Sequence, residues 1–181
     1  MKHRWERRGG KIVYDAGIFR VRVDEYQFRG RPASHPFHVL ETNDWVNVVP
    51  ITSQDEIVMV RQYRHGVEEV CLEIPGGMID DTDPDPAAAA VRELAEETGY
   101  GGDEPRPLGS VSSNPAILAN RTYTYWIGNA EPVAPPQPDE HEDFVLELCP
   151  VREVPDLIAR GEIHHSLSVV ALLRYLHLRE A

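Results

Sequence analysis

The fold of this chain is decided by Gly76-Gly77-Met78-Ile79-Asp80-Asp81 and by the segment from Ala87 to Arg92-Glu93-Leu94-Ala95-Glu96-Glu97-Thr98-Gly99. Local signals predict a helix here, because Asp85 suits an N-cap, Pro86 the first helical position and Gly99 the left-handed residue that ends a helix. At about 100° per residue, three glutamates share an arc of about 100° on that helix. They are Glu93, Glu96 and Glu97, and Ala87, Val91, Leu94 and Thr98 lie roughly opposite.

Carboxylates placed three and four residues apart on one helical face repel one another. The apolar side of the helix should therefore face a core, and the acidic side should face a cation. Oxygen ligands without histidine or cysteine suit Mg²⁺ or Mn²⁺, which bridge carboxylates to substrate phosphates. A solvated acidic face is the ordinary interpretation of such a pattern, and the residues around it argue against that interpretation here.

Those residues resemble the signature of the Nudix hydrolase superfamily, which runs Gly, five residues, Glu, seven residues, then Arg-Glu-apolar-x-Glu-Glu-x-Gly-apolar. The second half is complete from Arg92 to Tyr100, whereas Pro84 stands where the first Glu belongs and Gly77 lies one residue too far upstream. We interpret the loop as carrying a one-residue insertion, with Asp83 or Asp85 as the nearest acidic substitute. The resemblance implies that metal is held by Glu93, Glu96, Glu97 and the backbone carbonyl of Gly76.

The C-terminal part of the chain is similar to one branch of the superfamily, the ADP-ribose pyrophosphatases and related nucleotide-sugar hydrolases. The similarity begins at the acidic stretch Asp139-Glu140-His141-Glu142-Asp143. Carried over by position, Glu140 would be the general base and Glu142 a further metal ligand. His141 is the weaker candidate base, because histidine is the commonest general base but the family uses carboxylates. A solvated acidic loop is the other interpretation.

Three further residues bear on the substrate. Arg64, in Arg61-Gln62-Tyr63-Arg64, matches a family arginine that contacts the substrate, and a surface salt bridge is its alternative role. Pro115 lies sixteen residues beyond Gly99, where the branch has a diagnostic proline. Its context, Ser113-Asn114-Pro115-Ala116, differs from the Ser-Pro-Gly of strict ADP-ribose enzymes and leaves the preferred sugar open. Trp45 has two possible roles, stacking on a base or packing in the core.

Composition restricts the class of partner. The 181 residues carry 18 Lys and Arg against 30 Asp and Glu, for a net charge of −12 and no basic block. We therefore expect no nucleic acid and no membrane as partner. No apolar run is long enough to span a bilayer, and the N-terminal residues are charged, unlike a signal peptide. With Cys71 and Cys149 interpreted as reduced core residues, we expect a cytoplasmic protein.

Hydrophobic periodicity predicts a series of strands, interrupted by the acidic helix and followed by two more helices. Strands are expected at 12–14, 19–23, 37–40, 45–51, 57–63, 70–74, 108–111, 122–127 and 144–148, and helices at 155–160 and 168–178. The Pro-rich segment 131–138 should be a mobile loop. The resemblance implies an α/β fold, a Nudix-type α/β/α sandwich with a mixed β-sheet. Residues 1–43 would be an N-terminal β extension for dimerisation, and residues 44–181 the Nudix hydrolase domain.

The resemblance thus implies a Nudix pyrophosphohydrolase that acts as a homodimer on a nucleotide-sugar substrate. With two or three Mg²⁺ ions per site, it would cleave ADP-ribose or an ADP- or GDP-sugar to a nucleoside monophosphate and a sugar phosphate. Two alternatives stay open at this point. One is a nucleoside triphosphate pyrophosphohydrolase, and the other is a non-catalytic Nudix module that senses a nucleotide.

Overall fold

The computed structural model describes residues 4–137 and 143–180 of the chain, which divides into two compact units. Unit 1 consists of Met1–Asp44 with Ser112–Arg121, and unit 2 of Trp45–Val111 with Thr122–Ala181. The sequence pattern gives no hint that residues 112–121 belong with the N-terminal strands. They do so through backbone hydrogen bonds on both sides of Leu40, whose N–H donates to Ile117 (2.7 Å) and whose carbonyl accepts from Ala119 (3.0 Å).

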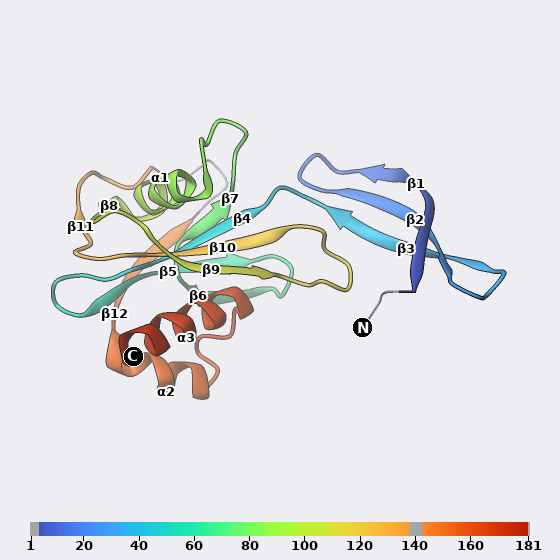
Figure 1. The fold of residues 1–181 in the computed structure, drawn as a ribbon. Coiled ribbons are helices and arrows are strands. Elements are labelled where there is room, and N and C mark those ends of the chain that lie inside the picture. Colours follow the sequence, from blue (N-terminus) through green and yellow to red (C-terminus); the bar gives the residue numbers. More distant parts are fainter. Residues whose placement is uncertain (1–3, 138–142, 181) are drawn as a thin grey trace. The chain divides into compact units, whose positions relative to one another are not determined.

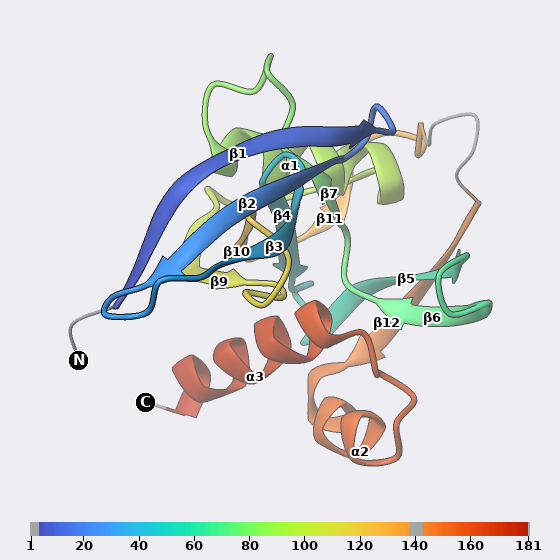
Figure 2. The ribbon, with the colours of Figure 1, turned by 90° about the vertical axis from the view of Figure 1, so that its right-hand side faces the viewer.

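Unit 1 is an antiparallel sheet in the order β1-β2-β3 (Figure 2). Its strands are Trp5–Asp15, Arg20–Phe28 and Ser34–Glu41. The turns between them contain Gly17 and Gly30, whose φ angles of 82° and 86° favour glycine. Trp5 packs edge-on against Phe28 and Phe37, with ring centroids 5.1 and 5.3 Å apart. All three elements are longer than periodicity predicts.

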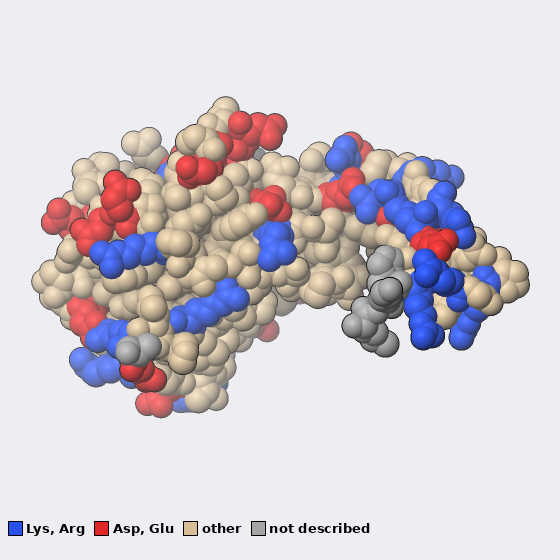
Figure 3. Space-filling view, viewed as in Figure 1, with Lys and Arg blue, Asp and Glu red and all other residues tan. Residues whose placement is uncertain are grey.

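The interior of unit 1 is polar. Asp24 is fully buried and pairs with Arg7 at 2.6 Å and Arg22 at 2.8 Å. Hydrogen bonds from Arg22 and Arg7 lower the pKa of Asp24, against the opposite effect of burial. Among the described residues, every buried hydrophobic side chain belongs to unit 2. Figure 3 shows Lys and Arg side chains gathered over β1, β2 and β3.

Unit 2 contains the sheets of the sandwich. One has the order β7-β4-β10-β9 and is mixed, because β4 pairs in parallel with β10 and antiparallel with β7. The other is antiparallel, in the order β12-β5-β6. A short ribbon joins β8 to β11. The strands are β4 Trp45–Pro50, β5 Glu56–Arg64, β6 Glu69–Glu73, β7 Gly76–Met78, β8 Tyr100–Gly101, β9 Arg106–Ser112, β10 Arg121–Ile127, β11 Glu131–Pro132 and β12 Phe144–Pro150.

Helices cover both sides of these strands (Figure 1). On one side α1 (Pro86–Thr98) packs Ala89, Ala90 and Leu94 on Val46 and Val48 of β4. On the other side lie the short helix η1 (Val151–Glu153), α2 (Val154–Ala159) and α3 (Ser166–Glu180), which share a core with Val49 of β4. Side chains alternate along a strand, so β4 faces α1 with one set and α3 with the other. The expected α/β/α sandwich with a mixed sheet is confirmed.

The described part of the Pro-rich segment is hydrogen-bonded to the end of α1. Val133 and Ala134 donate their N–H groups to the Gly99 carbonyl (2.8 and 3.1 Å), and Gln137 donates to the Glu96 carbonyl (2.7 Å). A helix ends with carbonyls that lack intrahelical partners, and this segment supplies donors for two carbonyls at the end of α1. The segment is therefore attached to the end of α1 up to Gln137, and its mobility stays a prediction. Separately, none of the described helices has the length and apolarity of a membrane span.

Candidate active site

A cavity of about 260 Å³ in unit 2 collects the acidic face of α1 and the glycine turn. The helix begins as the sequence predicts, with the Asp85 side chain accepting from the N–H groups of Ala87 and Ala88, both at 2.9 Å. It ends at Gly99, whose φ is 73°. Because Ala89, Ala90 and Leu94 pack on β4, the glutamates on the other side of the helix face away from that core. The cavity is lined by all four expected metal ligands of the described chain: Gly76, Glu93, Glu96 and Glu97.

The two glycines allow β7 to approach its neighbours more closely than a side chain permits. A Cβ atom on Gly76 would lie 2.3 Å from the carbonyl oxygen of Val46, and one on Gly77 would lie 2.4 Å from Glu93 Oε1. The Gly76 N–H donates to Glu97 Oε2 at 3.2 Å. The turn therefore lies directly against two of the three carboxylates.

Arg92 ties the loop before α1 to the acidic face. Its Nε and Nη2 donate to the two carboxylate oxygens of Asp83 at 3.0 and 2.8 Å, and its Nη1 donates to Glu93 and Glu96 at 2.9 Å. The Arg92 hydrogen bond is the main reason that the pKa of Asp83 is lowered. Asp83 is thus the acidic substitute in the loop, whereas Asp85 serves as the helix N-cap.

The donor set fits a hard divalent cation, although the side chains do not converge on one point. Within residues 4–137 and 143–180, no three His, Cys, Asp or Glu side chains are arranged to hold a metal ion. Glu93 and Glu96 are turned toward Arg92 instead. Three carboxylates around one cavity, beside a glycine whose carbonyl could join them, are nevertheless the all-oxygen set that Mg²⁺ and Mn²⁺ prefer. Metal binding would replace contacts that Arg92 now makes.

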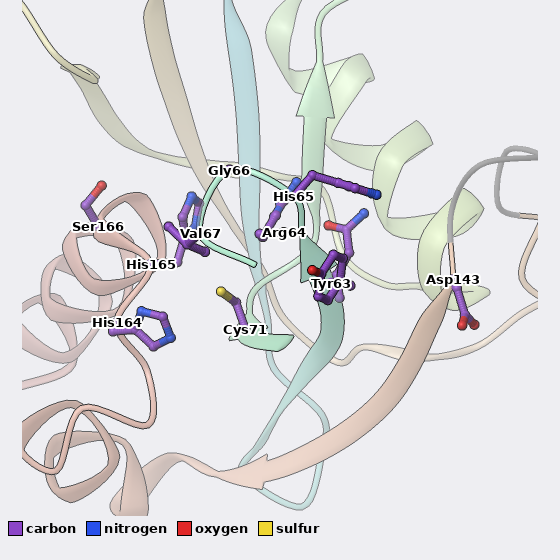
Figure 4. A pocket seen from close by; sticks show the side chains of 11 residues that line it. Tyr63, Arg64, His65, Gly66, Val67, Cys71, Asp143, His164, His165 and Ser166 are labelled. Atoms are coloured by element: carbon purple, nitrogen blue, oxygen red, sulfur yellow. The ribbon is translucent and has the colours of Figure 1, made fainter. Parts of the chain in front are cut away.

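Arg64 borders three cavities of unit 2. These are the acidic cavity, a cavity of about 300 Å³ and one of about 780 Å³. Figure 4 shows the largest, with residues of the β5–β6 hairpin facing His164, His165 and Ser166 from the start of α3. The Nε and Nη2 atoms of Arg64 donate to the two carboxylate oxygens of Glu73, both at 2.8 Å. Arg64 therefore pairs with a buried acid, not with a surface one.

Sequence reasoning missed Glu73, which is only 1% exposed. Its Oε2 also lies 3.0 Å from His165 Nδ1, and Ser168 Oγ lies 3.1 Å from the same nitrogen. Burial alone would raise the pKa of Glu73, but the hydrogen bonds of Arg64 and His165 outweigh it and lower the pKa to about 2. The sequence does contain one signal for it, an acid inside the apolar run that ends at Ile74. A strand in such a run is buried, and a buried carboxylate needs a charged or hydrogen-bonding partner.

The other expected site residues have different positions. Trp45 is half-buried and lines the cavity of about 300 Å³ together with Met78 and Thr122. Pro115 belongs to unit 1, in an exposed turn closed by Leu118 N–H donating to Asn114 at 2.8 Å. Glu140 and Glu142, and the alternative base His141, lie outside the described residues. The residues flanking them both line cavities: Gln137 the acidic one and Asp143 the largest one.

Comparison with known proteins agrees with this geometry. The model of the NUDIX domain matches residues 42–169. This chain belongs to the Nudix family. It is similar to a methanol dehydrogenase activator of Bacillus methanolicus, with 30% identity over 172 residues, 93% of this chain and 90% of that protein. An ADP-ribose pyrophosphatase of Mycobacterium tuberculosis is 26% identical over 173 residues, 95% of this chain and 83% of that one.

The fold of this Nudix protein is similar to that in the crystal structure of an ADP compounds hydrolase. The TM-score is 0.87 at 23% sequence identity, and the match covers 98% of this chain and 95% of the other. At that identity the likeness concerns the fold alone. The expected resemblance to the Nudix superfamily is confirmed, and the chain is a Nudix hydrolase.

Proposed function

We propose that this Nudix hydrolase cleaves the pyrophosphate bond of a nucleoside diphosphate sugar, such as ADP-ribose or an ADP- or GDP-sugar. The observation that carries the proposal is the acidic cavity, where three glutamates of one helix, Gly76 and Arg64 surround about 260 Å³. The name of the Mycobacterium tuberculosis relative supports the substrate class. The products would be a nucleoside monophosphate and a sugar phosphate.

The reaction needs neutralised phosphate oxygens and an activated water. Two or three Mg²⁺ or Mn²⁺ ions, held by Glu93, Glu96, Glu97, the Gly76 carbonyl and Glu142, would polarise the phosphoryl oxygens. Arg64 would hold a phosphate through hydrogen bonds from its guanidinium. Gly77 lets β7 lie directly against Glu93, because a Cβ atom there would come within 2.4 Å of Glu93 Oε1.

Glu140 is proposed as the base that takes the proton of the attacking water, with a contribution of about 10²–10⁴-fold. Support comes from the described residues next to it in the chain. Gln137 lines the acidic cavity and donates its N–H to the Glu96 carbonyl at 2.7 Å. Gln137, three positions before Glu140 in the sequence, therefore lies at the acidic cavity. Trp45 and Pro115 remain proposed substrate contacts.

We also propose a cytoplasmic homodimer in which unit 1 packs on a second copy of the chain. The described part of unit 1 buries no hydrophobic side chain, yet exposes Ile12, Val13 and Tyr14 by 43%, 50% and 58%. A small sheet without an apolar core needs a surface to pack against. The first 44 residues hold nine of the 18 basic residues and six acidic ones, while the whole chain has a net charge of −12. A second copy therefore offers complementary charge.

A substrate panel with Mg²⁺ tests the proposed activity. ADP-ribose, ADP-glucose, GDP-mannose and deoxynucleoside triphosphates are compared, with products separated by anion-exchange chromatography. We expect a nucleoside monophosphate and a sugar phosphate from at least one nucleotide sugar. Turnover of triphosphates alone would establish the triphosphate pyrophosphohydrolase instead. Binding without turnover of any compound would indicate the sensing module.

A further inference from the structure

We infer that Glu73, held in turn by His165, is a positioning residue that fixes which edge of the Arg64 guanidinium faces the substrate. The inference rests on the proposed function, in which Arg64 contacts a phosphate-bearing substrate. It adds two residues that the Nudix motif does not contain and that the sequence did not indicate. Both lie in unit 2 and line the cavity of about 300 Å³, which Arg64 also borders.

The geometry of the Arg64–Glu73 pair sets the orientation. A guanidinium has two edges that can each grip an oxyanion with parallel hydrogen bonds. Glu73 takes the Nε–Nη2 edge of Arg64, with both bonds at 2.8 Å. The Nη1–Nη2 end is consequently turned away from Glu73. The Arg64 side chain is 41% exposed, whereas the Glu73 side chain is 2% exposed. The Nη1–Nη2 edge is therefore the edge of the guanidinium that a ligand can reach.

The charges of the pair lead to the same conclusion. Glu73 is ionised at neutral pH, because its pKa is lowered to about 2. Its negative charge offsets the positive charge of Arg64. Arg64 would therefore contribute directed hydrogen bonds more than net positive charge. The contribution of Arg64 to substrate binding therefore depends on the orientation of its guanidinium, and Glu73 fixes that orientation.

A second set of contacts fixes Glu73 itself. His165 Nδ1 lies 3.0 Å from Glu73 Oε2 and 3.1 Å from Ser168 Oγ. The hydroxyl of Ser168, which is 1% exposed, accepts from the Ile74 N–H at 3.3 Å. The carboxylate is thus held by His165, next to the start of α3, as well as by Arg64 of the neighbouring strand β5. Figure 4 shows Arg64 and His165 directed toward the same cavity.

The chain offers a matched control on the same strand. Arg61 pairs with Glu147 in the same two-bond pattern, Nε to Oε2 and Nη2 to Oε1, the latter at 3.1 Å. Arg61 and Arg64 are three positions apart in the strand, so their side chains leave opposite faces of β5. Both partners of the control pair are part-exposed, at 39% and 37%, and neither lines the three cavities.

Steady-state kinetics on the best substrate of the panel test the inference. Glu73→Gln removes the charge and the grip on Arg64, and we expect KM to rise about tenfold while kcat and the Mg²⁺ midpoint hardly change. Glu73→Asp should recover part of the loss, and His165→Gln should raise KM by a smaller factor. Glu147→Gln should leave KM unchanged. If Glu73 acts through Arg64, the double variant Glu73→Gln/Arg64→Ala should have the KM of Arg64→Ala alone.

Several outcomes would overturn the inference. One is a Glu73→Gln variant that melts earlier but keeps the KM of the wild type, since that would show a purely structural role. Another is a double variant whose KM is the product of the two single effects. If Glu73→Gln does not fold, Glu73→Asp and His165→Gln decide in the same way. Failure of the proposed function is seen separately, as a wild-type enzyme that hydrolyses no compound of the panel, and the same variants are then compared by calorimetric binding of ADP-ribose.

Discussion

Asp83 accepts two parallel hydrogen bonds from Arg92, at 3.0 and 2.8 Å, across nine residues of the chain. The Asp83 side chain is 7% exposed in this pair. In a Nudix signature the loop glutamate lies six positions after the glycine and eight before the arginine, whereas Asp83 lies six positions after Gly77 and nine before Arg92. The inserted residue therefore lies between Asp83 and Arg92, and the shorter acid still reaches the guanidinium.

Replacing Asp83 with alanine should raise the Mg²⁺ concentration needed for half-maximal activity. Arg92 would lose its loop partner and compete more strongly for Glu93 and Glu96, the proposed metal ligands. A Mg²⁺ titration of turnover measures the shift, and we expect a several-fold increase. The control is Asp85→Ala, which loses the helix cap and should cost about 1 kcal/mol of unfolding free energy with an unchanged midpoint. Equal midpoints for Asp83→Ala and the wild type would contradict this assignment.

The neighbouring glycines should respond differently to alanine. At Gly76 the new Cβ would meet the Val46 carbonyl at 2.3 Å, and backbone cannot move aside cheaply. We expect Gly76→Ala to lower the melting temperature clearly. At Gly77 the Cβ would meet the end of the Glu93 side chain, which can rotate, so Gly77→Ala should fold and bind Mg²⁺ more weakly. Thermal unfolding and metal titration separate the two effects, and the reverse pattern would refute them.

The metal ligands and the proposed base should be separable by kinetics. Glu93→Gln or Glu97→Gln should weaken metal binding and turnover together, so excess Mg²⁺ should restore part of the activity. Glu140→Gln should lower kcat about 10²–10⁴-fold with little change in KM or Mg²⁺ dependence, because a base acts in the transition state. Full activity of Glu140→Gln beside an inactive His141→Ala would transfer the role of base to His141. If neither variant matters, the metal alone activates the water.

Acid should weaken the fold through Glu73. Burial alone would raise the pKa of Glu73, but Arg64 and His165 lower it from 4.5 to about 2, so the unfolded chain binds this proton more tightly than the folded protein. The stabilising contribution of Glu73 is therefore complete above about pH 5 and is lost as the pH falls toward 2. Denaturant unfolding of the wild type and Glu73→Gln should show a stability difference that shrinks over this range. A difference that stays constant would contradict the pKa shift.

Light scattering should give a molar mass of about twice 20.4 kDa for the intact chain at micromolar concentration. The reason is that unit 1 has no buried hydrophobic side chain among its described residues and exposes aromatic and β-branched ones. Tyr14→Glu, at an exposed position of β1, should shift the equilibrium toward monomer with the melting temperature of unit 2 unchanged. A stable wild-type monomer would count decisively against the dimer.

The acidic helix could be predicted almost residue for residue because its signals are local. Asp85, Pro86 and Gly99 determine its ends, and its periodicity determines which side is buried. The strands β7, β8 and β11 could not be predicted, since two or three residues carry no periodicity. They form because β4 and the end of α1 provide partners.

The same distinction applies to the site. Glu93, Glu96 and Glu97 lie on one helix, so their meeting in one cavity follows from spacing. The pairing of Arg64 with Glu73 depends instead on the register of β5 against β6, where Val60 faces Glu73. Glu73 also contacts His165, which lies ninety-two positions later in the sequence. This contact forms only when the start of α3 packs beside the end of β6. No local pattern encodes either contact.

The hydrogen bonds from Val133, Ala134 and Gln137 to the end of α1 have a consequence for protein engineering. The helix that carries the proposed metal ligands and the segment that leads to Glu140 are one mechanical piece, bound through the carbonyls of Glu96 and Gly99. A loop exchange between Nudix enzymes that begins at residue 138 would keep this attachment. One that begins nearer β10 would remove it and leave the last turn of the helix without its donors. Chimeras meant to change specificity should therefore join after Gln137.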